Sequence, residues 1–254
     1  MSQDSILDQA DASLARGDAA GAERVLTQAW RDLSKAPADA LHILAMVRAS
    51  ERNWEEAERL LRAATRAEPN SLRHHVALGH LLLSVGNFAG AADAYAVAVR
   101  IDSTWPGLLE VAADANYRAG RLEEAERIAR QAISRSPTPN GWDALSCALR
   151  GQGKAQDALN AADEALRLDW GHVNAQNSRG AALLMLNRPQ EALETFETLA
   201  SQGVEAPVLS LNRGAALEAL GRKADARAVY DHAAQRWPHM PNLQDRVAAA
   251  RKRV

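Results

Sequence analysis

The sequence repeats itself along its length, and this repetition constrains the fold more than any other feature. An alanine recurs at intervals of 33 to 35 residues, and two further positions, mostly small residues, recur with the same period. A fixed period of this length is typical of stacked supersecondary units, each of which contacts only its neighbours. The alanine series is Ala22, Ala57, Ala91, Ala125, Ala158, Ala192 and Ala226.

Residues 207–238 show what one unit contains. Leucines recur at helical spacing before Gly221, which interrupts the run, and Ala226 and Tyr230 then resume it. The pattern predicts two helices joined by a tight turn. Gly214 and Ala226 are small, so we expect the helices to cross there, with Tyr230 filling the space beside the crossing.

The small residues, the turn glycine, the aromatic residue of the second helix and the closing proline stand at offsets that resemble the tetratricopeptide repeat (TPR) family. The resemblance covers roughly residues 3–240. It implies an all-α, right-handed α-solenoid, or superhelix, of seven TPR-like helical hairpins plus a C-terminal helix. The copies start near residues 3, 38, 72, 106, 139, 173 and 207.

Residues 241–254 form the predicted C-terminal helix. Leu243, Val247, Ala250 and Val254 fall on one helical face. This segment fits a capping helix that covers the apolar side of the seventh hairpin, and it fits equally well the start of an eighth repeat. Both interpretations stay open at this stage.

Some copies depart from the repeat pattern at single positions. Each departure replaces a small residue, the aromatic residue or the turn glycine, and we expect each to weaken one joint without changing the fold. The departures are Ser146, Leu199, Ala129, Ala162, Arg52 and Asn187.

Trp54 begins a second helix, and we expect it to fill the elbow of its hairpin.

Composition argues against several classes of function. The 30 basic and 32 acidic residues are interspersed, so the sequence has no basic patch for nucleic acid. The N-terminus does not read as a signal peptide, and no apolar run approaches the roughly 18 residues of a membrane span. Cys147 is the single cysteine, which excludes an internal disulfide. These features predict a cytoplasmic protein.

The sequence also contains no motif for catalysis. There is no G-x-S-x-G, no P-loop, no H-E-x-x-H and no paired-cysteine zinc spacing, so we predict no enzymatic activity, no cofactor and no metal site. His75 and His80 are five residues apart, which places them on different helical faces. Cys147 is interpreted as a small buried apolar residue.

The resemblance implies a peptide-binding groove on the concave side, lined by a stripe of residues from the first helices. Three zones are expected: an apolar zone with histidines, an acidic zone, and a zone of asparagines that could hold a ligand's backbone. The acidic zone argues against a receptor for the carboxylate of a chaperone tail. The predicted groove residues are His42, Met46, Val76, His80, Leu83, Glu110, Asp114, Tyr117, Asp143, Arg150, Asn174, Asn177 and Asn212.

The sequence therefore predicts a non-catalytic scaffold that binds a protein or peptide partner. One alternative is the N-terminal recognition arm of a longer enzyme, a transferase or an oxygenase, which the length of the gene would reveal. Another is a structural scaffold that self-assembles end on end as a homo-oligomer, which size-exclusion chromatography across concentrations would detect. The sequence does not name the partner.

Overall fold

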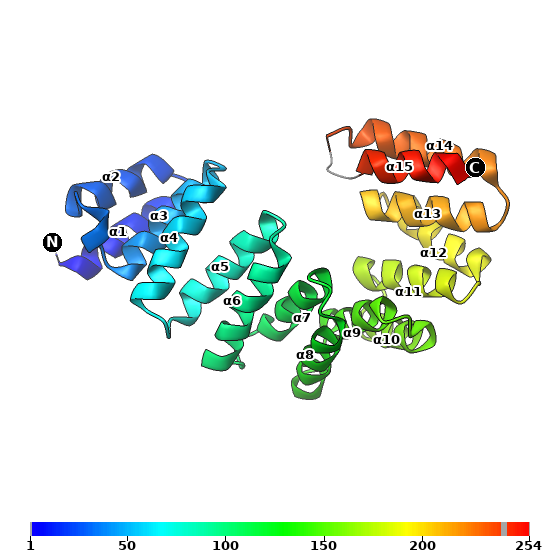
Figure 1. The fold of residues 1–254 in the computed structure, drawn as a ribbon, viewed down its shortest axis with the longest axis horizontal. Helices are drawn as coiled ribbons and strands as arrows, with labels where there is room; N and C mark the ends of the chain where they lie inside the picture. The colour runs from blue at the N-terminus through cyan, green and yellow to red at the C-terminus, as the bar shows by residue number, and fades with distance from the viewer. Residues whose placement is uncertain (1, 240–242, 254) are drawn as a thin grey trace. The chain divides into compact units, whose positions relative to one another are not determined.

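The computed structural model describes residues 2–239 and 243–253. Within these residues the regular structure consists of fifteen α-helices and one short 3₁₀ helix, with no β-strand (Figure 1). The helices alternate between the first and second members of successive hairpins. The all-α solenoid architecture predicted from the period is thereby confirmed.

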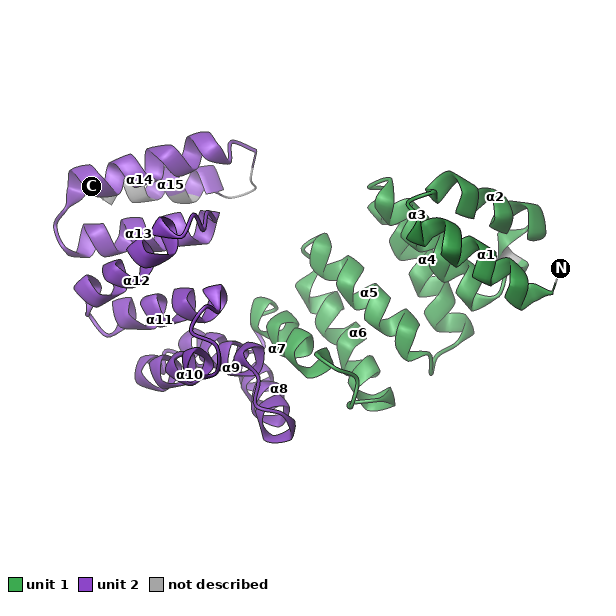
Figure 2. Cartoon of the chain, turned by 180° about the vertical axis from the view of Figure 1, so that it is seen from behind, with its two compact units in different colours: residues 1–119 green, residues 120–254 purple. Residues whose placement is uncertain are grey.

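The chain divides into two compact units, residues 1–119 and residues 120–254 (Figure 2). We call them unit 1 and unit 2 and describe each by itself. The elements of unit 1 are α1 (Gln3–Ala15), α2 (Ala19–Ala29), the 3₁₀ helix η1 (Leu33–Lys35), α3 (Ala38–Ser50), α4 (Trp54–Ala67), α5 (Leu72–Ser84), α6 (Phe88–Ile101) and α7 (Leu108–Arg118).

Unit 2 continues the same alternation. Its helices are α8 (Leu122–Arg135), α9 (Pro139–Gly151), α10 (Ala155–Leu168), α11 (Val173–Met185), α12 (Pro189–Ser201), α13 (Pro207–Ala219), α14 (Lys223–Arg236) and α15 (Leu243–Arg253). Leu243 and Val247 of α15 are buried, and α15 contacts α13 and α14. Ala250 and Val254, predicted on the same face, lie outside the residues whose side chains the structure describes.

The turns within the hairpins explain where the second helices begin. The side chains of Asp18, Asn53 and Asn87 each accept a hydrogen bond from the backbone N–H three residues later, which caps α2, α4 and α6. The turn residue before the cap has a left-handed backbone. Arg52 and Asn187 adopt this conformation, with φ of 60° and 55°, so the turn forms without glycine at these two positions.

The crossing of the two helices within a hairpin depends on matched side-chain sizes. A Cβ atom added to Gly214 would lie 2.1 Å from the ring of Tyr230, and one added to Gly180 would lie 2.5 Å from Phe196. The predicted close crossing, with Tyr230 beside Gly214, is confirmed. Where the aromatic residue is replaced by Ala162, the opposing small residue is Ser146, and its hydroxyl donates to the carbonyl of Ala158 at 2.8 Å.

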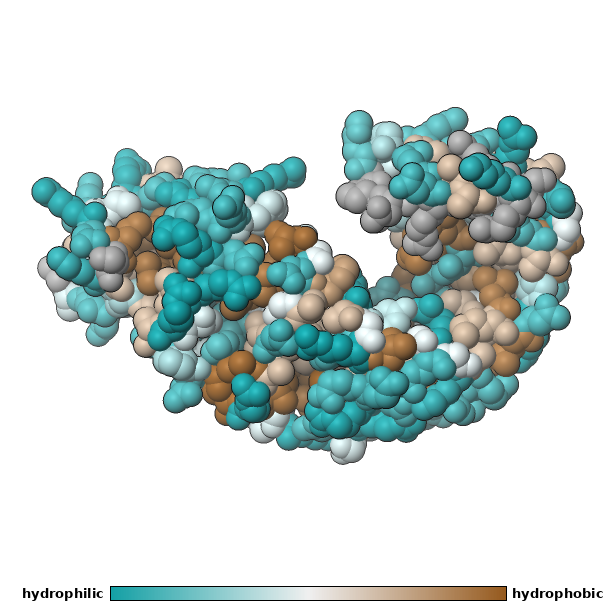
Figure 3. Space-filling model, in the orientation of Figure 1, coloured by the Kyte–Doolittle hydropathy of each residue, from teal (hydrophilic) through white to brown (hydrophobic). Residues whose placement is uncertain are grey.

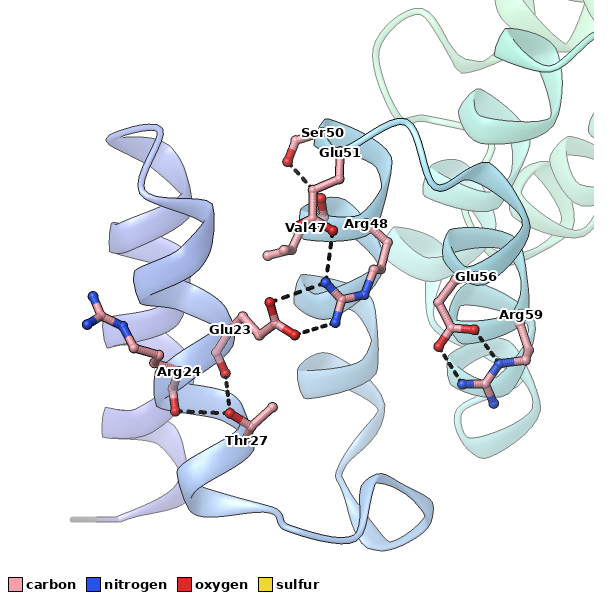
Figure 4. Close-up of polar contacts among 9 residues, drawn as sticks. All are labelled: Glu23, Arg24, Thr27, Val47, Arg48, Ser50, Glu51, Glu56 and Arg59. Atoms are coloured by element: carbon pink, nitrogen blue, oxygen red, sulfur yellow. Dashed lines mark hydrogen bonds and ion pairs between the residues drawn. The ribbon is translucent and has the colours of Figure 1, made fainter.

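Hairpins stack through contacts between consecutive first helices as well as between neighbouring helices in the chain. In unit 1, α1 contacts α3, and in unit 2 α9 contacts α11 and α11 contacts α13. An ion pair reinforces one of the joints: the guanidinium of Arg48 on α3 faces the carboxylate of Glu23 on α2 and also binds Glu51 at 2.9 Å (Figure 4). First helices of successive hairpins therefore lie against one another in both units.

The second helices carry much of the solvated surface. In Figure 3 the surface over α8 and α10 is predominantly hydrophilic. The expectation that Trp54 fills the elbow of its hairpin is wrong, because this side chain is 40% exposed. Trp54 is the first residue of α4, directly after the cap residue Asn53, and the hairpin core there is filled by leucines and alanines instead.

Candidate partner-binding site

The predicted groove residues lie on the first helices, and their neighbours decide which of them can contact a ligand. We call the surface formed by α1, α3, α5 and α7 the first-helix face of unit 1. The corresponding surface of α9, α11 and α13 is the first-helix face of unit 2. The two faces differ in their chemistry, and each is described in turn.

A charged network crosses the first-helix face of unit 1. The guanidinium of Arg73 on α5 lies 3.1 Å from the carboxylate of Asp11 on α1 and 3.3 Å from that of Asp39 on α3. One side chain thus bridges three first helices. Asp39 and Arg73 stand 34 residues apart, so opposite charges one period apart were the signal in the sequence for this network.

His42 is a predicted groove residue that the structure places inside the stack. It is only 6% exposed, and its Nδ1 lies 3.1 Å from Nδ1 of His74, which is fully buried. The pKa of His42 is lowered to about 3, mainly by burial and also by the positive charge of Arg73. The prediction that His42 faces a ligand is wrong, because its position faces the next first helix.

The histidines of α5 have different environments. The Nε2–H of His75 donates to the carbonyl of Pro69 at 2.9 Å, so the chain's own backbone holds this ring. His80 is exposed, and its ring lies edge-on against Tyr95, with ring centroids 5.7 Å apart. Among the described residues, no group of three or more histidine, cysteine or acidic side chains is arranged to hold a metal ion.

The remaining predicted residues of unit 1 are half-buried: Met46, Val76, Leu83, Glu110, Asp114 and Tyr117. The first three offer apolar surface on α3 and α5. The carboxylate of Asp114 pairs with Arg118 one turn later, at 2.8 Å. The acidic zone is therefore partly neutralised by its own helix.

A polar chain runs from α9 to α11 in unit 2. The hydroxyl of Ser178 donates to the carboxylate of Asp143 at 2.6 Å, and its oxygen lies 3.5 Å from the sulfur of Cys147. A nitrogen of Arg150 lies 4.0 Å from the same sulfur. Ser178 was not predicted, because its role depends on the packing of α11 against α9.

Cys147 is not poised for chemistry. Burial raises the pKa of its thiol to about 11, and the nearby carboxylate of Asp143 acts in the same direction. A thiol with a pKa this high holds almost no thiolate at neutral pH, and the thiolate is the reactive form. Cys147 is half-buried and contacts the polar side chains of Ser178 and Arg150, so its surroundings are more polar than those of the small buried apolar residue predicted from the sequence.

The predicted asparagines come together in unit 2. The side-chain N–H of Asn212 on α13 donates to the side-chain oxygen of Asn177 on α11 at 2.9 Å. Both residues are half-buried, and Asn174 is exposed one turn before Asn177. The structure therefore places a neutral pair of amides across two consecutive first helices, next to an exposed third amide.

The arrangement of both faces suits recognition. Unit 1 presents apolar side chains beside paired charges, and unit 2 presents amides beside a hydrogen-bonded carboxylate. Amides, hydroxyls and paired carboxylates can hold the backbone and side chains of another chain.

Comparisons with known proteins identify the fold and the family. The fold and its repeated hairpins define the class of helical solenoids. A family model described as "Tetratricopeptide repeat" matches residues 44–106, 144–207 and 186–241, and the chain belongs to this family. A search of curated proteins found no significant match.

Several solved structures share the fold. A tetratricopeptide repeat protein from Parabacteroides merdae is 13% identical, with 98% of both chains covered and a TM-score of 0.82. A thermophilic TPR protein from Thermus thermophilus is 22% identical over 71% of this chain and 98% of its own, with a TM-score of 0.64. A chain of the APC/C hetero-tetramer Cut9–Hcn1 is 14% identical over 89% of this chain and 45% of its own, with a TM-score of 0.66.

Repeats of this family typically mediate protein–protein interactions, and the fold is generally a non-catalytic scaffold. Within the part of the chain that the structure describes, no helix is long and apolar enough to cross a lipid bilayer.

Proposed function

We propose that this protein is an interaction scaffold that binds a partner protein through extended segments on the first-helix face of each unit. In unit 2 the backbone of such a segment contacts Asn177 and Asn212, with Asn174 and Asp143 beside them. In unit 1 an apolar side chain of the partner rests on Met46, Val76 and Leu83. The other predicted groove residues lie at the border of these contacts: His80, Glu110, Asp114, Tyr117 and Arg150.

The observation that carries the proposal is the Asn177–Asn212 hydrogen bond. A side-chain amide has two N–H donors and two acceptor lone pairs. The bond between the two residues uses one donor of Asn212 and one lone pair of Asn177. The pair is therefore oriented by its own hydrogen bond and keeps both a donor and an acceptor for a peptide group.

The family supports this proposal, because its repeats typically mediate protein–protein interactions. One structural neighbour was solved within a hetero-tetramer, where a chain of similar fold is assembled with another protein. A neutral hydrogen bond contributes roughly 0.5–1.5 kcal/mol net, so a few such contacts with apolar burial give an affinity of about micromolar.

The test begins with ligands selected from a library of random peptides displayed on phage, using the whole chain as the target. Calorimetry then compares their binding to the parent and to the double variant Asn177→Ala/Asn212→Ala. We expect the double variant to bind severalfold more weakly with an unchanged melting temperature. Asn160→Ala is the matched control, because Asn160 is an exposed asparagine on the second helix α10.

The proposal is contradicted if the selected peptides bind the double variant as tightly as the parent. It is also contradicted if Asn160→Ala weakens binding as much as the double variant does. Substitution of Glu124 or Arg127, which pair with each other on the second helix α8, should likewise leave binding unchanged.

A further inference from the structure

A recess in unit 2 lies away from the first-helix face residues described above. Its volume is about 210 Å³, and a single water needs only about 10–15 Å³, so the recess has room for a long side chain. We call it the Trp170 recess. It is lined by Leu166, Trp170, Gln176, Arg179, Glu191, Glu194, Thr195 and Thr198.

A fixed turn shapes one wall of the Trp170 recess. The side-chain N–H of Gln176 donates to the backbone carbonyl of Trp170 at 2.6 Å. Leu166 belongs to a buried cluster with Ala165 and Ala175, which makes the apolar side of the recess part of the core. The recess is therefore built from well-packed residues of α10 and α11 and closed by α12.

The recess combines an exposed aromatic ring with a buried acceptor. Trp170 is 72% exposed, the highest value among the exposed large apolar side chains of the described residues. Gln176 is only 4% exposed, and its Oε1 has no hydrogen-bond partner. A buried acceptor without a partner costs free energy, which a ligand with an N–H donor would recover.

The charges around the recess leave one carboxylate without a cation. Arg179 pairs with Asp163 at 2.9 Å, and Glu191 pairs with Arg188 at 2.6 Å. Glu194 accepts a hydrogen bond from the neutral side chain of Gln190 at 3.0 Å, and no ion pair involving it is present among the described residues. Arg179 also donates to the hydroxyl of Thr195 at 3.0 Å, so the carboxylate of Glu194 is the lining charge that a cationic ligand could pair with.

The corresponding place in unit 1 provides a natural contrast. Residues 69 and 75 precede 170 and 176 by three repeats, and the same side-chain-to-carbonyl bond joins His75 to Pro69. The recess there is lined by Pro69, Asn70, His75, Val97, Arg100 and Ile101. It has neither a tryptophan wall nor a carboxylate, and Arg100 is its charged lining residue. The features of the Trp170 recess are thus specific to this copy and do not come from the repeat alone.

We propose that the Trp170 recess binds an arginine side chain of a partner protein. The planar guanidinium stacks on the indole of Trp170, where aromatic faces attract cations. Its N–H groups donate to the carboxylate of Glu194 and to Oε1 of Gln176. This site is separate from the asparagine pair, so it does not depend on the proposed function of the first-helix face.

The experiment uses N-acetyl-L-arginine amide as the probe and the whole chain labelled with ¹⁵N. The indole Nε1–H signal of Trp170, assigned by its loss in Trp170→Phe, is followed during titration. We expect a saturable shift with a dissociation constant of about 1 mM, as suits a single side chain. The neutral isostere N-acetyl-L-citrulline amide should produce no saturable shift.

Two variants of α12 distinguish a charge-specific site from a general effect. Glu194→Gln should weaken binding of the arginine probe about fivefold, because it removes the carboxylate and keeps the shape. Glu197→Gln is the matched control on the same helix outside the recess and should change nothing. Asn177→Ala/Asn212→Ala should also leave this titration unchanged, which separates the recess from the first-helix face.

The proposal is overturned if the citrulline probe shifts the Trp170 signal as strongly as the arginine probe. It is equally overturned if the arginine titration does not saturate, or if Glu197→Gln weakens binding as much as Glu194→Gln. A melting curve of each variant that matches the parent confirms that the comparison is made on folded protein.

Discussion

The first-helix faces of the two units occupy the same place in the repeat, yet their polar side chains interact in different ways. In unit 1, Arg73 is held by two carboxylates from neighbouring first helices, and His42 contacts His74 inside the stack. In unit 2, the neutral amides of Asn177 and Asn212 share one hydrogen bond near the surface. The position in the repeat therefore does not decide whether a polar residue is buried within the stack or lies near the surface.

The difference follows from charge and burial. A charged or titratable group between packed helices must find a partner within the protein, because burying it alone is costly. A half-buried amide can satisfy part of its hydrogen bonding internally and leave the rest to another chain. Unit 1 thus uses these polar first-helix residues for contacts within the stack, and the amide pair of unit 2 retains hydrogen-bonding capacity, which the proposed function assigns to a partner.

The largest expected effect comes from a substitution that destabilises unit 2 and leaves the stability of unit 1 unchanged. Gly214→Leu places side-chain atoms where Tyr230 already lies, because even a Cβ atom would be 2.1 Å from its ring. We expect a loss of about 3 kcal/mol in the free energy of unfolding, at the upper end of typical overpacking. Hydrogen exchange should show lost protection in α13 and α14 and native protection in α3 and α5.

Ala215→Leu is the control for this prediction, since Ala215 is half-exposed on the same helix. It should change stability by far less. An unchanged melting curve for Gly214→Leu would show that the helices do not cross at Gly214.

A pH effect of intermediate size should act on unit 1 alone. The pKa of His42 is lowered to about 3 in the folded protein, against about 6.5 for an unfolded histidine. The unfolded state therefore binds the proton first, and the contribution of this residue to stability, complete above pH 6.5, is lost as the pH falls toward 3. Between pH 7 and 5 we expect α3 and α5 to lose about 1–2 kcal/mol of protection against hydrogen exchange.

Three charged residues act on the pair of His42 and His74. Arg73 opposes protonation of both rings, and Asp39 and Glu68 favour protonation of His74, whose pKa is nevertheless lowered by burial. His42→Gln removes the titration and keeps a polar side chain beside His74, so it should reduce the pH dependence. If unit 2 lost protection as steeply as unit 1 over this range, the histidine pair would not be the cause.

The smallest expected effect concerns the charged network itself. The side chain of Arg73 is 48% exposed, and the two carboxylates beside it are similarly exposed. Exposed ion pairs contribute about 0–1 kcal/mol, so Arg73→Ala should cost no more than about 1 kcal/mol in urea unfolding. The same variant should raise the pKa of His42, because it removes a neighbouring positive charge. A loss above about 2 kcal/mol would show that the network carries more of the stability of unit 1 than its exposure suggests.

Much of the fold could be predicted from the sequence, because a helical hairpin is a local structure. Gly214 and Tyr230 are sixteen residues apart, and their match within one copy indicates a close crossing without knowledge of the rest of the chain. The tolerance of the turn for Arg52 and Asn187 followed from the same argument. Trp54 was predicted wrongly, because the direction of a side chain at the start of a helix depends on the cap before it.

The candidate site was less predictable, because it depends on contacts between copies. His42 and Asn177 stand at the same position of their repeats, three residues before the small residue, yet one is buried against α5 and the other meets Asn212 near the surface. The outcome depends on which residue the next first helix presents. The Trp170 recess needs side chains from α10, α11, α12 and the turn at Trp170, and its signals in the sequence were Trp170 in place of Pro69 and Gln176 in place of His75.

The most direct test of the central claim is a footprint of a selected peptide on the whole chain. Hydrogen exchange or backbone amide NMR, measured with and without the peptide, reports which helices it covers. Contact with the first-helix face of unit 2 predicts increased protection and the largest shifts in α11 and α13 around Asn177 and Asn212. Changes confined to the second helices α10, α12 and α14, with α11 and α13 unaltered, would contradict the account.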